Sequence, residues 1–220
     1  MTAYEHVMVG INLALASGLH RRYGWPIVSV AAFTSALPDW DGLSILFGGE
    51  AYARAHRVWG HNLLVAAGSG AAVAMLAYGL DLRGYFTKIA DRFRRGAPAS
   101  DKLTRARPPA FCFVDLVIWL SVGIISSLSH LAVDLFYSFH AQLTPWPLPL
   151  LWPFSDRTWV FPAVAYGDLG ATAIFIIEMF CLVRWPARAQ FIAWISLSLV
   201  AAYIVIRWGL VLNSVPPGYS

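Results

Sequence analysis

Long apolar stretches are the feature that most constrains how this chain can fold. Stretches at about 112–135, 159–183 and 190–212 are each long enough to cross a bilayer, which takes roughly 20 residues of helix. A fourth, at about 61–80, is rich in glycine and alanine, which allows close helix packing in lipid. Because 58% of the 220 residues are hydrophobic and only 13% are charged, an integral membrane protein is predicted rather than a water-soluble one.

Two further segments, at about 6–20 and 25–38, are apolar but short, and both carry polar residues. They are interpreted either as short spans or as a helical hairpin that dips into the membrane. The predicted fold is therefore all-α, a polytopic membrane helical bundle of about six transmembrane or re-entrant segments. No part of the sequence suggests a separate soluble domain, so residues 1–220 are predicted to form a single membrane domain.

The excess of positive charge lies mainly in one connecting segment. Residues 81–110 hold eight Lys or Arg and three Asp. Such a cluster can bind nucleic acid, but next to membrane segments it is typical of a cytoplasmic loop, so no nucleic-acid partner is expected. If the segments alternate in direction, Arg21, Arg22, Arg184 and Arg188 fall on the same inner side. Both chain ends are then predicted to lie outside.

Histidine and aspartate side chains gather at the predicted outer ends of these segments, and only His20 among the six histidines is on the inner side. His130 and Asp134 are four residues apart, so on a helix they share one face. Imidazole nitrogen and carboxylate oxygen are the ligands that Zn²⁺ takes in proteins. The outer set comprises His6, Asp39, Asp41, His56, His61, His130, Asp134 and His140.

This set predicts a divalent metal site. Histidine and aspartate ligands without thiolate suit zinc, manganese or iron and do not choose among them, and zinc is taken as the first candidate. Asp39 and Asp41 follow Pro38, which ends a helix and lets both carboxylates turn back. The predicted metal ligands are His6, Asp39, His56, His61, His130, Asp134 and His140.

Each of these residues also has a simpler interpretation. A single histidine at a span end is commonly an interfacial residue, Asp39 can cap a turn, and Arg57 can anchor to headgroups. Ionisable groups at membrane depth are costly, however, and so many at one level favour a shared site. Asp115 and Glu178 lie toward the inner ends and are interpreted as interfacial. Asp168 is interpreted either as a partner of a ligand histidine or as a helix–helix hydrogen bond.

These residues resemble the LexA-regulated, membrane-bound metal-dependent hydrolase family over about residues 1–160. The resemblance implies a multi-pass protein of the bacterial cytoplasmic (inner) membrane, and the last two spans carry none of the motifs. The motifs that carry it are His6, Leu37-Pro38-Asp39-Trp40-Asp41, His56-Arg57 with His61, His130 with Asp134, and Leu151-Trp152-Pro153-Phe154.

A more distant likeness is to the zinc-dependent phospholipase C and P1 nuclease group. There the ligands run in a similar order and end with a further histidine motif. No histidine follows His140 here, so one or two metals are expected rather than three. The likeness implies that the first six places are filled by His6, Asp39, His61 (or His56), His130, Asp134 and His140.

The predicted function is a metal-dependent hydrolase that acts at the outer face of the membrane on a lipid-linked substrate, most simply a phosphoester. Asp41, or whichever of His56 and His61 does not bind metal, is the predicted general base. Arg57 is predicted to hold phosphate or to stabilise developing negative charge. Membrane lipids are the expected partners, and the sequence sets no oligomeric state. The alternatives are a transport or metal-handling protein and an accessory protein with a structural metal site.

Overall fold

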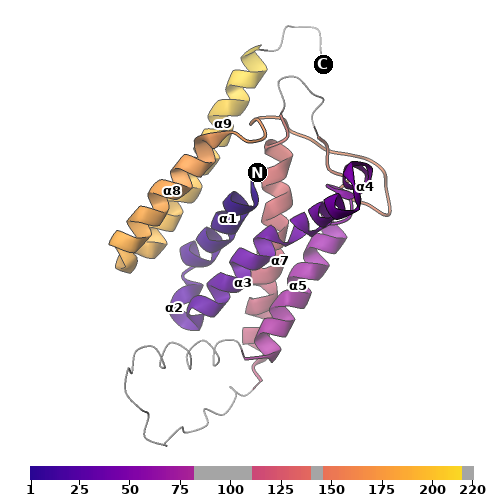
Figure 1. The fold of residues 1–220 in the computed structure, drawn as a ribbon. Helices are drawn as coiled ribbons and strands as arrows, with labels where there is room; N and C mark the ends of the chain where they lie inside the picture. Colours follow the sequence, from indigo (N-terminus) through magenta and orange to yellow (C-terminus); the bar gives the residue numbers. More distant parts are fainter. Residues whose placement is uncertain (82–110, 140–145, 215–220) are drawn as a thin grey trace, which may run out of the picture.

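The computed structural model describes residues 1–81, 111–139 and 146–214. All the regular secondary-structure elements in these ranges are helices (Figure 1). Within these ranges there is no β-strand, only two isolated bridges, so the prediction of an all-α chain is confirmed there. The helices are α1 (Ala3–Ala16), α2 (Leu19–Tyr23), α3 (Trp25–Ala36), the 3-10 helix η1 (Leu37–Phe47), α4 (Gly49–Ala55), α5 (Leu63–Gly79), α7 (Phe113–Phe136), α8 (Leu169–Arg184), the 3-10 turn η2 (Pro186–Arg188) and α9 (Ala189–Ser214).

Two stretches of helix in the described residues are long and apolar enough to cross a bilayer: Phe113–Phe136 and Pro186–Val211. The first two predicted segments form α1 and α3, which have 14 and 12 residues. At 1.5 Å per residue they are about 21 and 18 Å long, less than the roughly 30 Å of a hydrocarbon core. Length and composition therefore support two spans, and the six-segment arrangement is not established.

Small residues let the central helices cross closely. Gly70 of α5 faces Gly123 of α7, and a Cβ on either would overlap the other's carbonyl oxygen. Gly10 of α1 lies in the same way against the carbonyl oxygen of Ala31 in α3. This is the small-residue packing expected between helices in lipid, and within the 61–80 segment Gly70 is the glycine that makes it.

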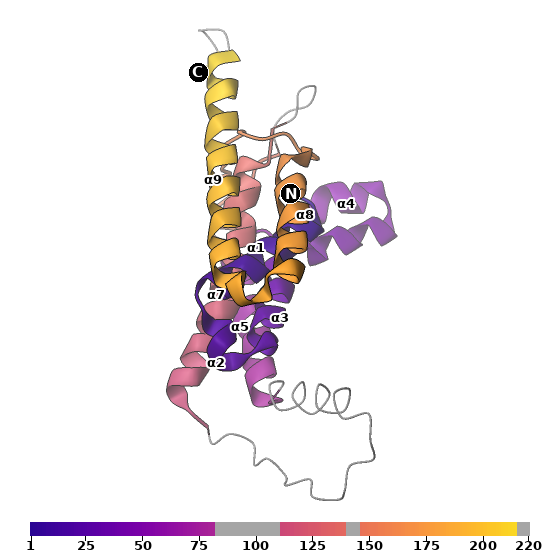
Figure 2. The same cartoon turned by 90° about the vertical axis from the view of Figure 1, so that its left-hand side faces the viewer.

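The pair α8–α9 lies along one flank of the bundle and covers α1 (Figures 1 and 2). Helix α8 begins at Leu169, ten residues later than the sequence suggested, because Asp168 caps it by accepting from the Gly170 amide at 2.8 Å. Asp168 also accepts a hydrogen bond from the Tyr203 hydroxyl and lies 3.4 Å from Arg207, both on α9. Of its two interpretations, the structure therefore shows the helix–helix contact.

The 3-10 helix η1 begins where Pro38 interrupts the α3 backbone pattern. With α4 it forms a hairpin that stands out to one side of the bundle (Figure 2). The base of this hairpin meets the start of α5 and the end of α7. The opposite ends of α5 and α7 are those that flank residues 82–110. The hairpin base therefore marks the end of the bundle at which the polar residues of α1, η1 and α7 gather.

Candidate metal centre

Most of the predicted ligands lie together at this end of the bundle. They come from the start of α1, from η1, from the end of α4 and the turn that follows it, and from the last turns of α7. His140 lies outside the described residues, and His20 is on α2, beyond the far end of α1 (Figure 1). The residues that could hold an ion are His6, Asp39, Asp41, His56, His61, His130 and Asp134, in three overlapping groups.

Four candidate ligand atoms from three parts of the chain face one another at the centre. The Nε2 atoms of His61 and His130 are 3.1 Å apart. Asp39 Oδ1 lies 3.4 Å from the first and 3.5 Å from the second, and Asp134 Oδ2 lies 3.7 Å from both. Two ligands of a tetrahedral ion, each bonded at roughly 2.0–2.1 Å, lie about 3.3–3.4 Å apart. The observed separations fall on either side of that value, so the donor set fits a four-coordinate ion.

Hydrogen bonds on the far side of each ring set the protonation of these two histidines. His130 Nδ1 lies 2.8 Å from the carbonyl oxygen of Ser35, and His61 Nδ1 lies 3.0 Å from Asp41 Oδ2. Both oxygens accept, so each Nδ1 carries a proton, and the Nε2 of a neutral ring then presents a lone pair. Two lone pairs at 3.1 Å repel each other unless a proton or a metal ion lies between them. The arrangement therefore favours a cation at the centre.

Asp41 lies behind the histidines rather than in the open, with only 1% of its surface exposed. Its Oδ1 is 2.9 Å from His56 Nδ1, and its Oδ2 accepts from the Gly60 amide at 2.8 Å as well as from His61. With both oxygens engaged, Asp41 is suited to orient the two rings. Of the predicted general bases, Asp41 has both oxygens engaged, whereas His56 is held by Asp41 through its Nδ1.

Arg57 is also buried and fully engaged. Its Nη2 lies 3.2 Å from Asp134 Oδ2, and its Nη1 donates to Ser138 Oγ and to the carbonyl oxygen of Trp146, both at 3.1 Å. Its φ of 63° is in the left-handed region, which a non-glycine residue adopts only when its surroundings hold it there. The contacts show Arg57 paired with the carboxylate of Asp134, where the sequence suggested that Arg57 holds phosphate or stabilises developing charge.

His6 completes the buried side of the centre. Its ring stacks on that of His130 with centroids 3.5 Å apart, and its Nε2 is 3.1 Å from Asp134 Oδ1. The second oxygen of Asp134 faces His61 and His130. His6 is thus placed either to orient Asp134 or to serve as a further ligand on the same side.

The charges of the cluster are strongly coupled. Burial raises the pKa of a carboxyl, but hydrogen bonds with His130 and His61 outweigh this and hold the pKa of Asp39 below its usual range. The same balance, with His56 and His61 as partners, lowers the pKa of Asp41 to about 2. Burial lowers the pKa of His61, but hydrogen bonds to Asp39 and Asp41 raise it to about 9. The site therefore attracts positive charge, which a proton or a metal ion can supply.

Access to the centre runs along two of the ligands. The side chain of Asp39 is 29% exposed and that of His56 is 12% exposed, against 3% or less for His61, His130 and Asp134. His56 is flanked by Tyr52, which stacks on it at 4.6 Å between centroids, and by Trp146 at 5.1 Å. Water or a substrate would therefore meet Asp39 and His56 first.

Some residues that shape the centre carried no signal in the sequence. Ser35 acts on His130 through its backbone carbonyl, which any residue type could provide. Gly60 is needed because a Cβ there would overlap the carbonyl oxygen of Pro38. Ser138 stands four residues after Asp134 and bonds its carbonyl oxygen, a spacing that helical periodicity could have suggested.

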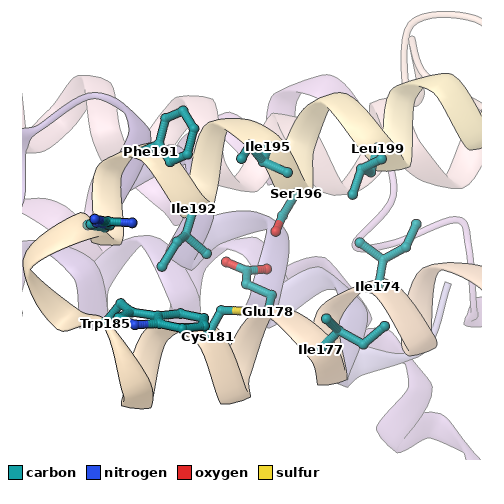
Figure 3. A pocket seen from close by; sticks show the side chains of 11 residues that line it. Ile174, Ile177, Glu178, Cys181, Trp185, Phe191, Ile192, Ile195, Ser196 and Leu199 are labelled. Atoms are coloured by element: carbon teal, nitrogen blue, oxygen red, sulfur yellow. The ribbon is translucent and has the colours of Figure 1, made fainter.

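A second polar feature lies apart from the centre. A groove of about 300 Å³ runs between α8 and α9, lined mainly by apolar side chains, and Glu178 lies in its wall facing Ser196 (Figure 3). Glu178 is only 2% exposed and accepts from Asn12 Nδ2 of α1 at 2.8 Å. The interpretation of Glu178 as an interfacial residue is therefore wrong, because its carboxylate is buried between three helices.

Comparison with known proteins gives one match. The family model described as YdjM inner membrane protein matches residues 1–211. The match spans every candidate ligand and most of the last helix. No curated protein and no solved structure matches.

Proposed function

This chain belongs to the YdjM inner membrane protein family, and we propose that it is a membrane-embedded, metal-dependent hydrolase. The observation that carries the proposal is the pair of histidine Nε2 atoms 3.1 Å apart, flanked by two carboxylates. A purely structural polar cluster would hydrogen-bond such groups to one another with donors facing acceptors. Here two histidine Nε2 atoms and two carboxylates converge on one point, which suits a cation, either a metal ion or a proton.

Asp39, His61 and His130, which form one of the three groups, would hold the ion together with Asp134, whose Oδ2 faces both histidines. Two neutral imidazoles and two carboxylates balance a divalent charge, and zinc is the first candidate, with manganese or iron as alternatives. When bound, the ion would supply the Lewis acidity for attack of water on a phosphoester. A further ion would have the group Asp41, His56 and His61 as its ligands, but the proposal needs only one ion.

His56 would transfer the proton, and Arg57 would position a candidate ligand. His56, oriented by Asp41 through its Nδ1, would accept a proton from the attacking water at Nε2. As the phosphorus–oxygen ester bond breaks, that proton is available to the departing oxygen. Arg57 acts through Asp134, which it holds in place by an ion pair 3.2 Å long.

The proposed location is the outer face of the cytoplasmic membrane. The centre lies at the end of the bundle opposite to the ends that flank the basic segment 82–110, which the positive-inside rule assigns to the cytoplasm. A site at headgroup depth suits a lipid-linked phosphoester as substrate. Reporter fusions to the 81–110 loop that report it outside would reverse the sidedness of the site.

The decisive experiment measures metal content and hydrolysis on the same purified samples. His61→Ala and His130→Ala are expected to lose bound metal and activity on bis(p-nitrophenyl) phosphate and on phospholipid vesicles, because each removes one of four ligands. His56→Ala should keep the metal but lose turnover, because it is proposed to move a proton and not to bind the ion. His20→Ala is the control and should change neither.

Stoichiometric metal without hydrolysis in the wild-type protein would support the metal-handling or structural alternatives instead. Wild-type protein that holds no metal, and gains no activity with added Zn²⁺ or Mn²⁺, would contradict the hydrolase proposal. Size-exclusion profiles of each variant show whether a loss reflects the site or the fold.

A further inference from the structure

The 3-10 helix η1 has two faces of opposite character. A 3-10 helix has three residues per turn, so residues three apart share a face. Pro38, Asp41 and Ser44 are buried, and the Ser44 hydroxyl donates to the carbonyl oxygen of Asp41 at 2.6 Å. The residues that precede Asp41 and Ser44, and those one turn further on, form a second stripe on a different face of the helix. Its members are exposed and apolar, namely Trp40, Leu43 and Leu46, with Phe47 next to them.

This outer stripe is large for side chains that face water. Leu46 and Phe47 are 78% and 83% exposed, and Leu43 is 63% exposed. Exposed apolar side chains that are contiguous mark a surface that contacts a partner or a membrane, whereas scattered ones are normal. The charged residues of η1, Asp39 and Asp41, both contact histidines of the candidate centre, so no charge interrupts the stripe.

The stripe continues onto neighbouring elements. Trp40 stacks on Trp59 with ring centroids 6.4 Å apart, and Trp59 is itself half exposed. Leu63 and Leu64 then begin α5 with exposed side chains. The other arm of the hairpin differs, because α4 carries the exposed ion pair of Glu50 and Arg54. The hairpin as a whole is therefore amphipathic, with tryptophans at its base, as in segments that lie in a membrane interface.

We propose that η1 lies in the interfacial layer of the bilayer, with the stripe Trp40, Leu43, Leu46 and Phe47 immersed among lipid chains and α4 facing water. The stripe is continuous with the exposed leucines of α5, so the same lipids that surround the helices also cover it. Asp39, the most exposed central ligand, directly precedes Trp40 in the chain. The consequence, which rests on the proposed function, is that the substrate is an amphiphile that reaches the metal centre from the plane of the bilayer.

The position of η1 is tested by site-directed labelling, independently of any activity. In a Cys112→Ser, Cys181→Ser background, Leu46→Cys and the matched control Arg54→Cys are each labelled with a polarity-sensitive fluorophore and reconstituted into phosphatidylcholine vesicles. Nitroxide groups on the lipid acyl chains should remove most of the fluorescence at position 46 and little at position 54, since only η1 is proposed to be immersed.

Equal quenching at the two positions would overturn the proposal. So would a label at position 46 that is shielded from lipid nitroxides but becomes exposed on dilution of the protein, because the stripe would then be an interface between copies of this chain. Shallow quenching at position 46 by headgroup nitroxides only would also count against immersion.

The entrance is tested with two substrates and a variant outside the metal centre. Leu46→Ser with Phe47→Ser should lower hydrolysis of a vesicle-borne phospholipid several-fold and leave hydrolysis of soluble bis(p-nitrophenyl) phosphate unchanged. A loss on both substrates, or on neither, would overturn the lateral entrance. If the wild-type protein hydrolyses neither substrate, the proposed function fails, while the labelling result still decides the position of η1.

Discussion

The candidate centre depends at the residue scale on atoms that hold each ligand from behind. Asp41 receives hydrogen bonds from two histidine rings and from the amide of Gly60, and the Ser35 carbonyl fixes His130. Partners of this kind commonly affect metal affinity by one to two orders of magnitude, about 10–100-fold. Their loss should therefore be visible even where no ligand is changed.

Gly60 offers a test that leaves every ligand in place. A Cβ at this position would overlap the carbonyl oxygen of Pro38 and lie 3.1 Å from Asp41 Oδ2. Gly60→Ala should lower the free energy of unfolding by about 1–3 kcal/mol, typical of overpacking, and weaken metal binding because Asp41 must shift. Thermal unfolding in detergent, with and without Zn²⁺, measures both effects.

The matched control is Gly68→Ala in α5, where nothing lies within 4 Å of the added Cβ. Alanine is the better helix former, so this variant should be unchanged or more stable by roughly 0.5–1 kcal/mol. If Gly60→Ala and Gly68→Ala have the same unfolding free energy and the same metal affinity, the close approach of Gly60 to Pro38 does not restrict the residue at position 60.

Part of the centre could be predicted from residue spacing. His130 and Asp134 are one helical turn apart, and the structure places both in the cluster, as the pattern suggested. The engagement of Arg57 could not be predicted, because it depends on a left-handed backbone and on Trp146, which is 89 positions away. Contacts of that separation follow from the packing of whole elements, which no local pattern encodes.

On the scale of elements, the hydrogen bond between Glu178 and Asn12 joins the flank of α8 and α9 to α1. Phe175, one turn earlier on α8, is fully buried in the hydrophobic core that includes Met8 and Val9 of α1. The start of α8 was misplaced by about ten residues because Phe161, Ala163 and Val164 are apolar, although they form an extended segment that bonds to the end of α7. Hydropathy alone does not separate such a segment from helix.

Glu178→Ala should destabilise the packing of α8 on α1, since it leaves the Asn12 side-chain amide buried without its acceptor. The cost of an unsatisfied buried group is about 1–3 kcal/mol. Glu178→Gln keeps an acceptor oxygen at nearly the same place and should retain most of the stability. Urea or heat unfolding in a fixed detergent compares the two.

A combined Asn12→Leu and Glu178→Leu variant separates the hydrogen bond from the burial of the groups. Replacing both partners by apolar side chains should cost less than removing one, because no polar atom is left unsatisfied. If Glu178→Ala is as stable as the wild-type protein, the contact does not hold the flank in place.

Across the whole molecule, the candidate centre connects segments that are far apart in the sequence. An ion bound by Asp39, His61, His130 and Asp134 would join η1, the turn before α5 and the end of α7. The apolar pattern of the sequence predicted α5 and α7, but it placed Asp39 in a turn rather than in η1, and the common meeting point of these segments appears only in the folded arrangement.

Metal removal should therefore change global stability and not only activity. Dialysis against a chelator should lower the melting temperature, and added Zn²⁺ should restore it. A ligand present at about 100 times its Kd stabilises the folded state by about 2.7 kcal/mol. His20→Ala should respond as the wild-type protein does, and His130→Ala should show no response to Zn²⁺. A melting temperature that is insensitive to chelator in the wild-type protein would argue against a bound ion.

The hydrogen bond from His130 to the backbone carbonyl of Ser35 has a consequence for how this family tolerates change. A backbone acceptor survives every side-chain replacement, so a substitution scan at position 35 would report nothing about the histidine it orients. Such a scan would respond instead to the other role of Ser35, whose hydroxyl donates to the carbonyl oxygen of His6 at 2.5 Å. A candidate ligand can therefore stay in place through a backbone atom whose role leaves no trace in the sequence, while the side chain at the same position serves a different contact.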